Sequence, residues 1–272
     1  MQNVPLVSDD GIWYNMHRTR QKVHIQPQGS ADAEQGLRPQ GLGPYLFYGK
    51  RMKTIAYIDG GNLYHGLLRG LPACKWLDIA ALVRAMLAHS HLDEDHELAA
   101  VKYFTSRTKT YPHDPASIER QNIYLQALIA HGGVDVIEGY YNKNKAWVPS
   151  VDSRCQECSA SVNGFVHVIK IEEKRTDVNL ATSLLRDAYT NAADAFVIVS
   201  GDADFIAPLD LVRHELKRRT IVFNPRQRPT DLRFHATQCW NIPRDLPAKC
   251  QLPEVIPVGT HGRTIHRPAA WK

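Results

Sequence analysis

The chain has 272 residues, 43% of them apolar, and a formal net charge of +5. This is the composition of an ordinary globular protein with one good-sized core or two small ones. No run approaches the roughly 18 consecutive apolar residues of a membrane helix, and the N-terminus lacks the apolar core of a signal peptide. We therefore expect a cytoplasmic protein without a membrane partner, and five unevenly spaced cysteines do not fit a secreted disulfide framework.

The positive charge lies at the two ends of the chain. Residues 53–224 hold 19 basic against 21 acidic residues, whereas residues 225–272 hold eight against three. A basic C-terminal segment could bind a phosphate backbone by counterion release, but a solvated tail has the same composition. Charge alone therefore does not predict a nucleic-acid partner.

The N-terminal part of the chain lacks a sustained apolar period. Residues 1–51 are rich in Gln, Gly and Pro, which predicts a disordered leader. Met52 precedes a short β-rich run, Lys53–Asp59, and a helical segment follows it. We therefore expect the folded domain to begin at Met52, which is an alternative translation start.

Helices and strands then alternate. Asp78 is placed to cap one helix, and Asp114, Pro115 and Gly132 are typical of the N-cap, first position and end of another. We expect helices at Leu77–His89, 114–131, Thr176–Asn191 and 203–219, and strands at Leu98–Ser106, Gly133–Tyr141, Phe165–Ile171, Ala195–Gly201 and Thr220–Pro225. Several strands are apolar throughout, as parallel strands buried on both faces are. The sequence therefore predicts a three-layer α/β/α sandwich with a mainly parallel central sheet.

The alternation breaks once. We expect an irregular, cysteine-containing insertion at about 142–164 within a domain that spans 52–225. The segment 226–272 is basic and rich in Pro, with one short element near WNIP, and we expect it to be a C-terminal extension. No internal repeat is apparent.

Polar side chains follow several of the predicted strands. Asp59 and Asn62 follow the first strand, Asp177 opens the helix after the Phe165 strand, and the stretch IVSGDADF ends a strand in Ser200, Asp202 and Asp204. The carboxyl ends of parallel strands meet at one edge of a sheet, where ligands bind. A helix-capping role would explain any one of these acids alone, but together they predict an acidic cluster.

Crowded carboxylates raise one another's pKa unless a cation lies between them. The hard divalent cations Mg²⁺ and Mn²⁺ prefer such oxygen ligands and usually keep several waters. A cation held in this way can activate water and stabilise charge on a phosphate. The cluster therefore predicts a Mg²⁺ or Mn²⁺ site.

Three separated motifs, YIDGGNLYHGL, KRTDVNLATSLLRDA and VIVSGDADFIAPL, stand in this order within the alternation. In this respect the chain resembles the NYN domain family, in its LabA-like branch, from about Met52 to Pro225. The family belongs to the PIN-like ribonucleases, and the resemblance implies a metal-dependent endoribonuclease that acts on RNA. One departure is Arg175-Thr176 before Asp177, where a small Gly-Val-like step is expected; Arg175 either contacts phosphate or is simply exposed.

The resemblance implies roles for the residues that match the family's motifs. It implies a metal centre formed by Asp59, Asp177 and Asp202, with Asp204 as a further ligand or as the residue that orients the attacking water. Asn62 and Ser200 support these acids or contact phosphate. Cleavage would leave 5′-phosphate and 3′-hydroxyl ends. The alternatives are a non-catalytic RNA-binding or regulatory module of the same fold and, less well supported, a haloacid-dehalogenase-like phosphohydrolase, which needs a second Asp where this chain has Gly61. Homodimerisation is an expectation from related folds, with no interface signature.

The remaining signals are weaker. Cys155 and Cys158 form half of a four-ligand zinc set, which fits either a structural zinc site or a loop with fortuitous thiols. His65 is the one histidine expected near the acidic edge. A basic set that could form a phosphate-binding rim, with Tyr64, Phe234 and Trp240 for base stacking, comprises Lys217, Arg218, Arg219, Arg226, Arg228 and Arg233.

Overall fold

The computed structural model describes residues 51–90, 92, 94–108, 114–149, 165–259 and 262–272. A six-stranded sheet with the order β3-β2-β1-β6-β7-β8 forms its centre, and every pairing in it is parallel. The strands are β1 (Met52–Asp59), β2 (His96–Thr105), β3 (Asp135–Glu138), β6 (Ala195–Val199), β7 (Arg219–Asn224) and β8 (Gln238–Asn241).

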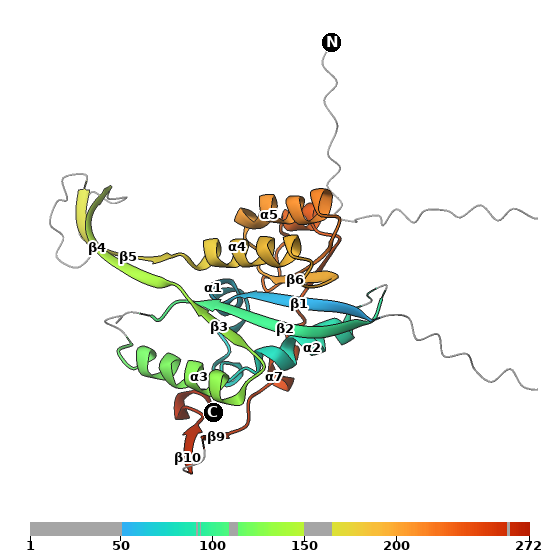
Figure 1. Cartoon of the computed structure of the whole chain (residues 1–272). Helices are drawn as coiled ribbons and strands as arrows, with labels where there is room; N and C mark the ends of the chain where they lie inside the picture. The colour runs from blue at the N-terminus through green and yellow to red at the C-terminus, as the bar shows by residue number, and fades with distance from the viewer. Residues whose placement is uncertain (1–50, 91, 93, 109–113, 150–164, 260–261) are drawn as a thin grey trace, which may run out of the picture. The chain divides into compact units, whose positions relative to one another are not determined.

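Helices cover both faces of this sheet (Figure 1). Each face of the sheet carries its own hydrophobic core, and alternate residues of β1 point into the two cores. Ala56 and Ile58 belong to one buried cluster, and Ile55 and Tyr57 belong to the other. The first cluster packs against α2 (Ile79–His89), α3 (Ser117–His131) and the short α7 (Leu246–Lys249). The second packs against α4 (Thr176–Tyr189), α5 (Ile206–Asp210) and the short α6 (Leu232–His235). The predicted three-layer α/β/α sandwich is confirmed.

Short turns complete the helical layer. α1 (Gly60–Leu63) continues into a π-helical turn at Tyr64–Leu68, and a second π-helical turn at Leu211–Glu215 follows α5. Single 3₁₀ turns lie at Pro72–Cys74, Ala203–Phe205 and Ala269–Trp271. The predicted helix 203–219 is thus a 3₁₀ turn, an α-helix and a π-helical turn in succession, and β7 begins already at Arg219.

The predicted irregular insertion is wrong over Asn142–Pro149. These residues belong to β4 (Tyr140–Pro149), which pairs antiparallel with β5 (Phe165–Lys174) in a separate two-stranded ribbon. Lys and Asn alternate with no apolar face in NKNK, so the pattern lacks the signal of a half-buried strand. A second ribbon joins β9 (Val255–Val258) and β10 (Arg263–His266).

The start of α3 and the end of the domain differ from the sequence prediction, whereas the cap of α2 agrees with it. α3 begins at Ser117 with Ala116 as its N-cap, and the Asp114 carbonyl oxygen accepts from Ser117, so Asp114 and Pro115 form a turn before the helix. Asp78 does cap α2, because its side chain accepts from the Ala81 N–H. β8 adds a strand to the sheet within the segment expected to be a C-terminal extension.

Parts of the sequence predictions lie outside the described residues. These are residues 1–50 of the leader and the tip of the insertion, with Cys155 and Cys158. Of the helices that are described, none combines the length and apolarity needed to cross a membrane.

Candidate active site at the carboxyl edge of the sheet

Asp59 ends β1 as a buried carboxylate, with 3% of the residue exposed. Its Oδ1 accepts from the Asn62 N–H at 2.9 Å, which makes Asp59 the N-cap of α1. Its Oδ2 accepts from Asn62 Nδ2 at 2.7 Å and from Ser200 Oγ at 2.9 Å. Gly60 permits this sharp turn, since an added Cβ would lie 2.7 Å from the Phe104 carbonyl oxygen. Burial raises the pKa of Asp59, although these hydrogen bonds oppose the shift.

The residues after β6 meet Asp59 from the neighbouring strand. Ser200 is fully buried, donates to Asp59 and accepts from the Asp202 N–H at 3.1 Å. Asp202 accepts from the Asp204 N–H through Oδ1 at 3.1 Å and is the N-cap of the next turn. The capping role expected for a lone Asp is therefore real, but it uses only one carboxylate oxygen of Asp202.

Asp177 lies in the first turn of α4 and is exposed to solvent. Partial desolvation, followed by repulsion from four acids, raises its pKa to about 6. In descending order these acids are Asp59, Asp202, Glu173 and Asp204. The structure therefore brings Asp59, Asp202 and Asp204 within electrostatic reach of Asp177.

Glu173 is an acid of this cluster that the sequence motifs do not identify. A Cβ built on Gly61 would lie 3.6 Å from its Oε2 and 3.5 Å from Asp59 Oδ1. Thr176 Oγ1 donates to Glu173 Oε1 at 2.6 Å and also pairs with Ser106 Oγ at 3.0 Å. The only signal was the position of Glu173 four residues before Asp177.

Arg175 occupies the position where the motif favours a small residue. Its φ of 75° lies in the left-handed region, which suits glycine better than arginine. The exposed guanidinium lies over the Tyr140 ring at 4.8 Å, a cation–π contact that offsets part of the strain.

The donor set at this edge consists of oxygens, which suit a hard divalent cation. Asn62 is buried, and its Oδ1 has no hydrogen-bond partner among the described residues, while its amide group donates to Asp59. Within the described residues, no three His, Cys, Asp or Glu side chains converge closely enough, as they stand, to hold a metal ion. Mg²⁺ needs only one or two carboxylates and retains several waters, so the residues fit such an ion without a closed protein cage.

Comparison with known proteins identifies the family. The model of the NYN domain matches residues 53–242. The chain belongs to the NYN domain family. NYN domains lie in the PIN-like nuclease superfamily, and the match extends past the predicted boundary at residue 225 to include β8.

One curated relative has a different activity in its name. The 6-hydroxy-3-succinoylpyridine 3-monooxygenase HspA from Pseudomonas putida is 34% identical over 241 residues, which cover 81% of this chain and 75% of the relative. A solved protein of unknown function from Vibrio parahaemolyticus is 16% identical with a TM-score of 0.41, covering 75% of this chain and 99% of its own. A Sir2 complex is 12% identical with a TM-score of 0.32, covering 72% and 89%. Both scores are too low to carry an argument.

Basic residues border the acidic cluster of this NYN domain on one side. A Cβ built on Gly66 would lie 3.0 Å from Arg226 Cγ, and one on Gly201 would lie 3.9 Å from Arg226 Cδ. Burial and the charges of Arg69 and Arg226 lower the pKa of His65, which also senses Glu173 and Asp59. His65 thus lies near the acidic edge, as the sequence predicted.

Half of the predicted basic rim is elsewhere. Arg218 donates to Asn191, and Arg219 opens β7 in an ion pair with Glu94, so Lys217, Arg218 and Arg219 lie at the amino edge of the sheet. Arg226, Arg228 and Arg233 follow β7 at the carboxyl edge. Beside them is a cavity of about 240 Å³ lined in part by Arg233, Cys239 and Trp240.

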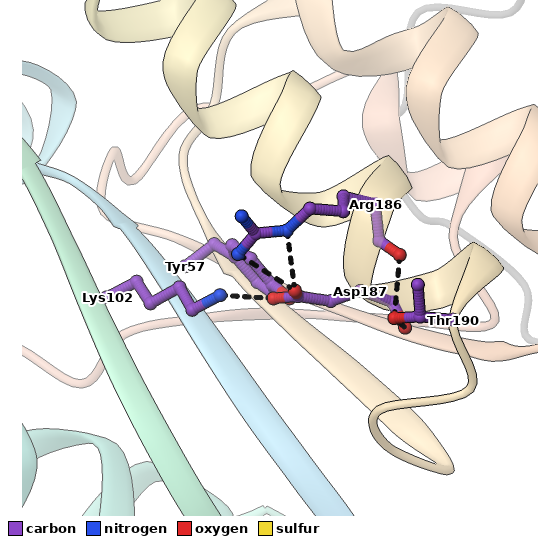
Figure 2. Close-up of polar contacts among 5 residues, drawn as sticks. All are labelled: Tyr57, Lys102, Arg186, Asp187 and Thr190. Carbon is purple, nitrogen blue, oxygen red and sulfur yellow. Dashed lines mark hydrogen bonds and ion pairs between the residues drawn. The ribbon is translucent and has the colours of Figure 1, made fainter.

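A buried polar network ties α4 to the sheet of the NYN domain (Figure 2). Tyr57 Oη donates to Asp187 Oδ2 at 2.6 Å, and Lys102 Nζ forms an ion pair with the same oxygen. Arg186 reaches Asp187 Oδ1 at 3.4 Å. Tyr57 and Lys102 are register partners on β1 and β2, and Asp187 lies near the end of the helix whose first turn carries Asp177. The network therefore sets the position of α4 over the sheet, which sequence analysis did not foresee.

Without divalent cations, an Asp177→Asn variant is expected to be more stable than wild type at pH 7.5. The folded pKa of about 6 exceeds the ordinary value of 3.8. The folded state therefore binds the proton more tightly, and stability falls as pH rises from about 4 to about 6. Because Asp177 is exposed, we expect a gain of only about 1 kcal/mol at pH 7.5 and little at pH 4. Denaturant unfolding in EDTA measures this, and equal stabilities at pH 7.5 would contradict it.

Proposed function

We propose that this NYN domain is an endoribonuclease that depends on Mg²⁺ or Mn²⁺. The observation that carries the proposal is the buried Asp59 carboxylate, fixed by Asn62 and Ser200, whose charge contributes to the raised pKa of Asp177. A bound cation would stabilise these carboxylates in their charged form by removing their mutual repulsion. Membership of a family within the nuclease superfamily supports the same chemistry.

Asp59, Asp177 and Asp202 would hold the cation, one or two of them directly and the rest through its waters, and Asp204 would be a further ligand or orient the attacking water. When bound, the cation supplies a water of lowered pKa and charge stabilisation at the scissile phosphate. Asn62 and Ser200 hold Asp59 in one orientation, which removes the cost of ordering it during the reaction. Arg226 would pair with the phosphate that enters beside the acids, because its side chain borders Gly201 and its charge acts on His65.

The direct test is a cleavage assay on defined single-stranded RNA and DNA, with Mg²⁺, Mn²⁺ or EDTA. We expect RNA cleavage with either cation, none in EDTA, and 5′-phosphate ends in the products. Asp202→Asn should lower the rate at least about a hundredfold, and a melting temperature in EDTA no lower than that of wild type is the folding control. RNA that stays intact with both cations, or an Asp202→Asn variant as active as wild type, would exclude the nuclease. Tight RNA binding without cleavage would instead support the non-catalytic module.

The second candidate is a monooxygenase that acts on a hydroxylated pyridine, and the observation that favours it is the 34% identity to the monooxygenase. Such a reaction inserts one oxygen atom of O₂ into the substrate and reduces the other to water with two electrons from a reductant. An oxygen electrode, with 6-hydroxy-3-succinoylpyridine and a nicotinamide reductant, separates the candidates. Substrate-dependent oxygen uptake supports the monooxygenase. Its absence, together with Mn²⁺-dependent RNA cleavage, supports the nuclease.

A further inference from the structure

The ribbon of β4 and β5 has two chemically different faces. In its antiparallel register Trp147 lies opposite His167, Lys145 opposite Ile169, and Tyr141 opposite Glu173. Because side chains alternate between the faces of a strand, the odd-numbered residues of both strands share one face. We call this the Trp147 face. Figure 1 shows the ribbon extending away from the central sheet.

The Trp147 face is exposed and carries aromatic, apolar and basic groups. Trp147 is 68% exposed, and its ring stacks on that of His167 with centroids 4.7 Å apart. Ile169 is 57% exposed and Phe165 is 55% exposed. Lys145, like Lys143, is exposed and has no ion-pair partner among the described residues.

The opposite face differs. Its lysines, Lys170 and Lys174, both pair with Glu172, and its valines are partly buried. The cations of that face are therefore already neutralised within the ribbon. Among the described residues of β4 and β5, the Trp147 face alone carries lysines without an acidic partner. The exposed ring of the opposite face, Tyr140, lies at the root of the ribbon under Arg175.

The Trp147 face leads directly to the acidic cluster. Glu173 stands at its root, where Tyr141 Oη donates to Glu173 Oε2 at 3.4 Å. The same Oε2 lies 3.6 Å from the Cβ position of Gly61, and the Glu173 charge contributes to the raised pKa of Asp59 and of Asp177. From Glu173 to His167 the strand spans six residues, which is about 20 Å. A ligand lying along this face would reach the carboxylates.

We propose that the Trp147 face binds the single-stranded RNA segment that leads into the acidic site. Exposed aromatic rings stack on unpaired bases of any sequence, and lysines along the strand neutralise phosphates. A second copy of the chain is a poorer occupant, because face-to-face association would bring Lys143 and Lys145 of each copy against like charges. The inference rests on the proposed function for its ligand class, but it concerns binding and does not require cleavage.

The test measures binding of fluorescein-labelled single-stranded oligoribonucleotides by anisotropy. The protein is the full chain with Asp202→Asn, measured in EDTA, so that no RNA is cleaved. Trp147→Ala is expected to weaken binding about tenfold, because a stacked base loses its platform. Lys145→Gln should weaken it severalfold and lower the slope of log K against log salt by about 0.7.

Lys170→Gln is the matched control, since this exposed lysine lies on the same ribbon but on the opposite face. It should bind within twofold of the parent. The proposal is overturned if Trp147→Ala binds as tightly as the parent, or if Lys170→Gln weakens binding as much as Lys145→Gln. It is also overturned if sedimentation shows a dimer that Trp147→Ala dissociates while RNA binding stays unchanged. A wild-type protein that shows this binding pattern but cleaves no RNA would refute the nuclease and leave the RNA-binding face standing.

Discussion

Replacing Asp59 by asparagine is expected to lower the rate of RNA cleavage about a thousandfold, whereas Asp204→Asn should stay within about tenfold of wild type. Asp59 is buried and accepts three hydrogen bonds, so its charge is fixed in place. Asp204 is exposed. Its backbone N–H donates to Asp202, but no described residue makes a hydrogen bond or ion pair with its carboxylate. A preorganised charge contributes more to a transition state than a mobile one.

The measurement is the single-turnover cleavage rate at saturating Mn²⁺, with Mn²⁺ affinity by calorimetry beside it. We expect Asp59→Asn to lose both cleavage activity and Mn²⁺ affinity, and Asp204→Asn to keep most of its cleavage activity and of its Mn²⁺ affinity. Melting in EDTA guards against a folding defect, because asparagine places an amide group against the donors that Asp59 accepts from. Equal rates for the two variants would show that burial and fixation of Asp59 do not matter for catalysis.

The sequence predicts the sheet and its acidic edge well, for a physical reason. The strands that carry Asp59 and Ser200 are parallel neighbours, and parallel strands end at the same edge. Once the alternation of strands and helices is recognised, residues 141 positions apart must meet, and Ser200 does donate to Asp59. The same logic does not account for Asp177, because β5, the strand before α4, pairs in the separate ribbon and not in the central sheet.

Features of the site that depend on the length and pairing of strands are harder to predict from the sequence. Arg219 and Arg226 are only seven residues apart in sequence. However, β7 begins at Arg219 and ends at Asn224, so about 20 Å of extended chain separates the two side chains. They therefore lie at opposite edges of the sheet. Glu173 was missed because β5 pairs outside the central sheet, with a polar strand that has no hydrophobic period.

Lys102→Met is expected to lower the free energy of unfolding by about 3 kcal/mol. Asp187 is 6% exposed. Its carboxylate forms ion pairs with Lys102 and Arg186 and accepts a hydrogen bond from Tyr57. Without Lys102 the carboxylate stays buried with only Tyr57 and the exposed Arg186 to compensate it. Lys249→Met is the control, because it breaks a fully exposed lysine–aspartate pair, with Asp245, and should leave the free energy of unfolding nearly unchanged.

Denaturant unfolding of a double-mutant cycle tests the mechanism. Asp187→Asn removes the charge but keeps an oxygen for Tyr57, so Lys102→Met with Asp187→Asn should recover more than half of the lost stability. Burial alone would raise the pKa of Asp187, but hydrogen bonds from Lys102 and Tyr57 hold it below the ordinary value of 3.8. Without Lys102 that pKa should rise, so the deficit of Lys102→Met should shrink as pH falls from 7 towards 4. A deficit that is the same at both pH values, or that the second substitution deepens, would mean that packing of the lysine stem, and not the buried charge, holds α4 and Asp177 in place.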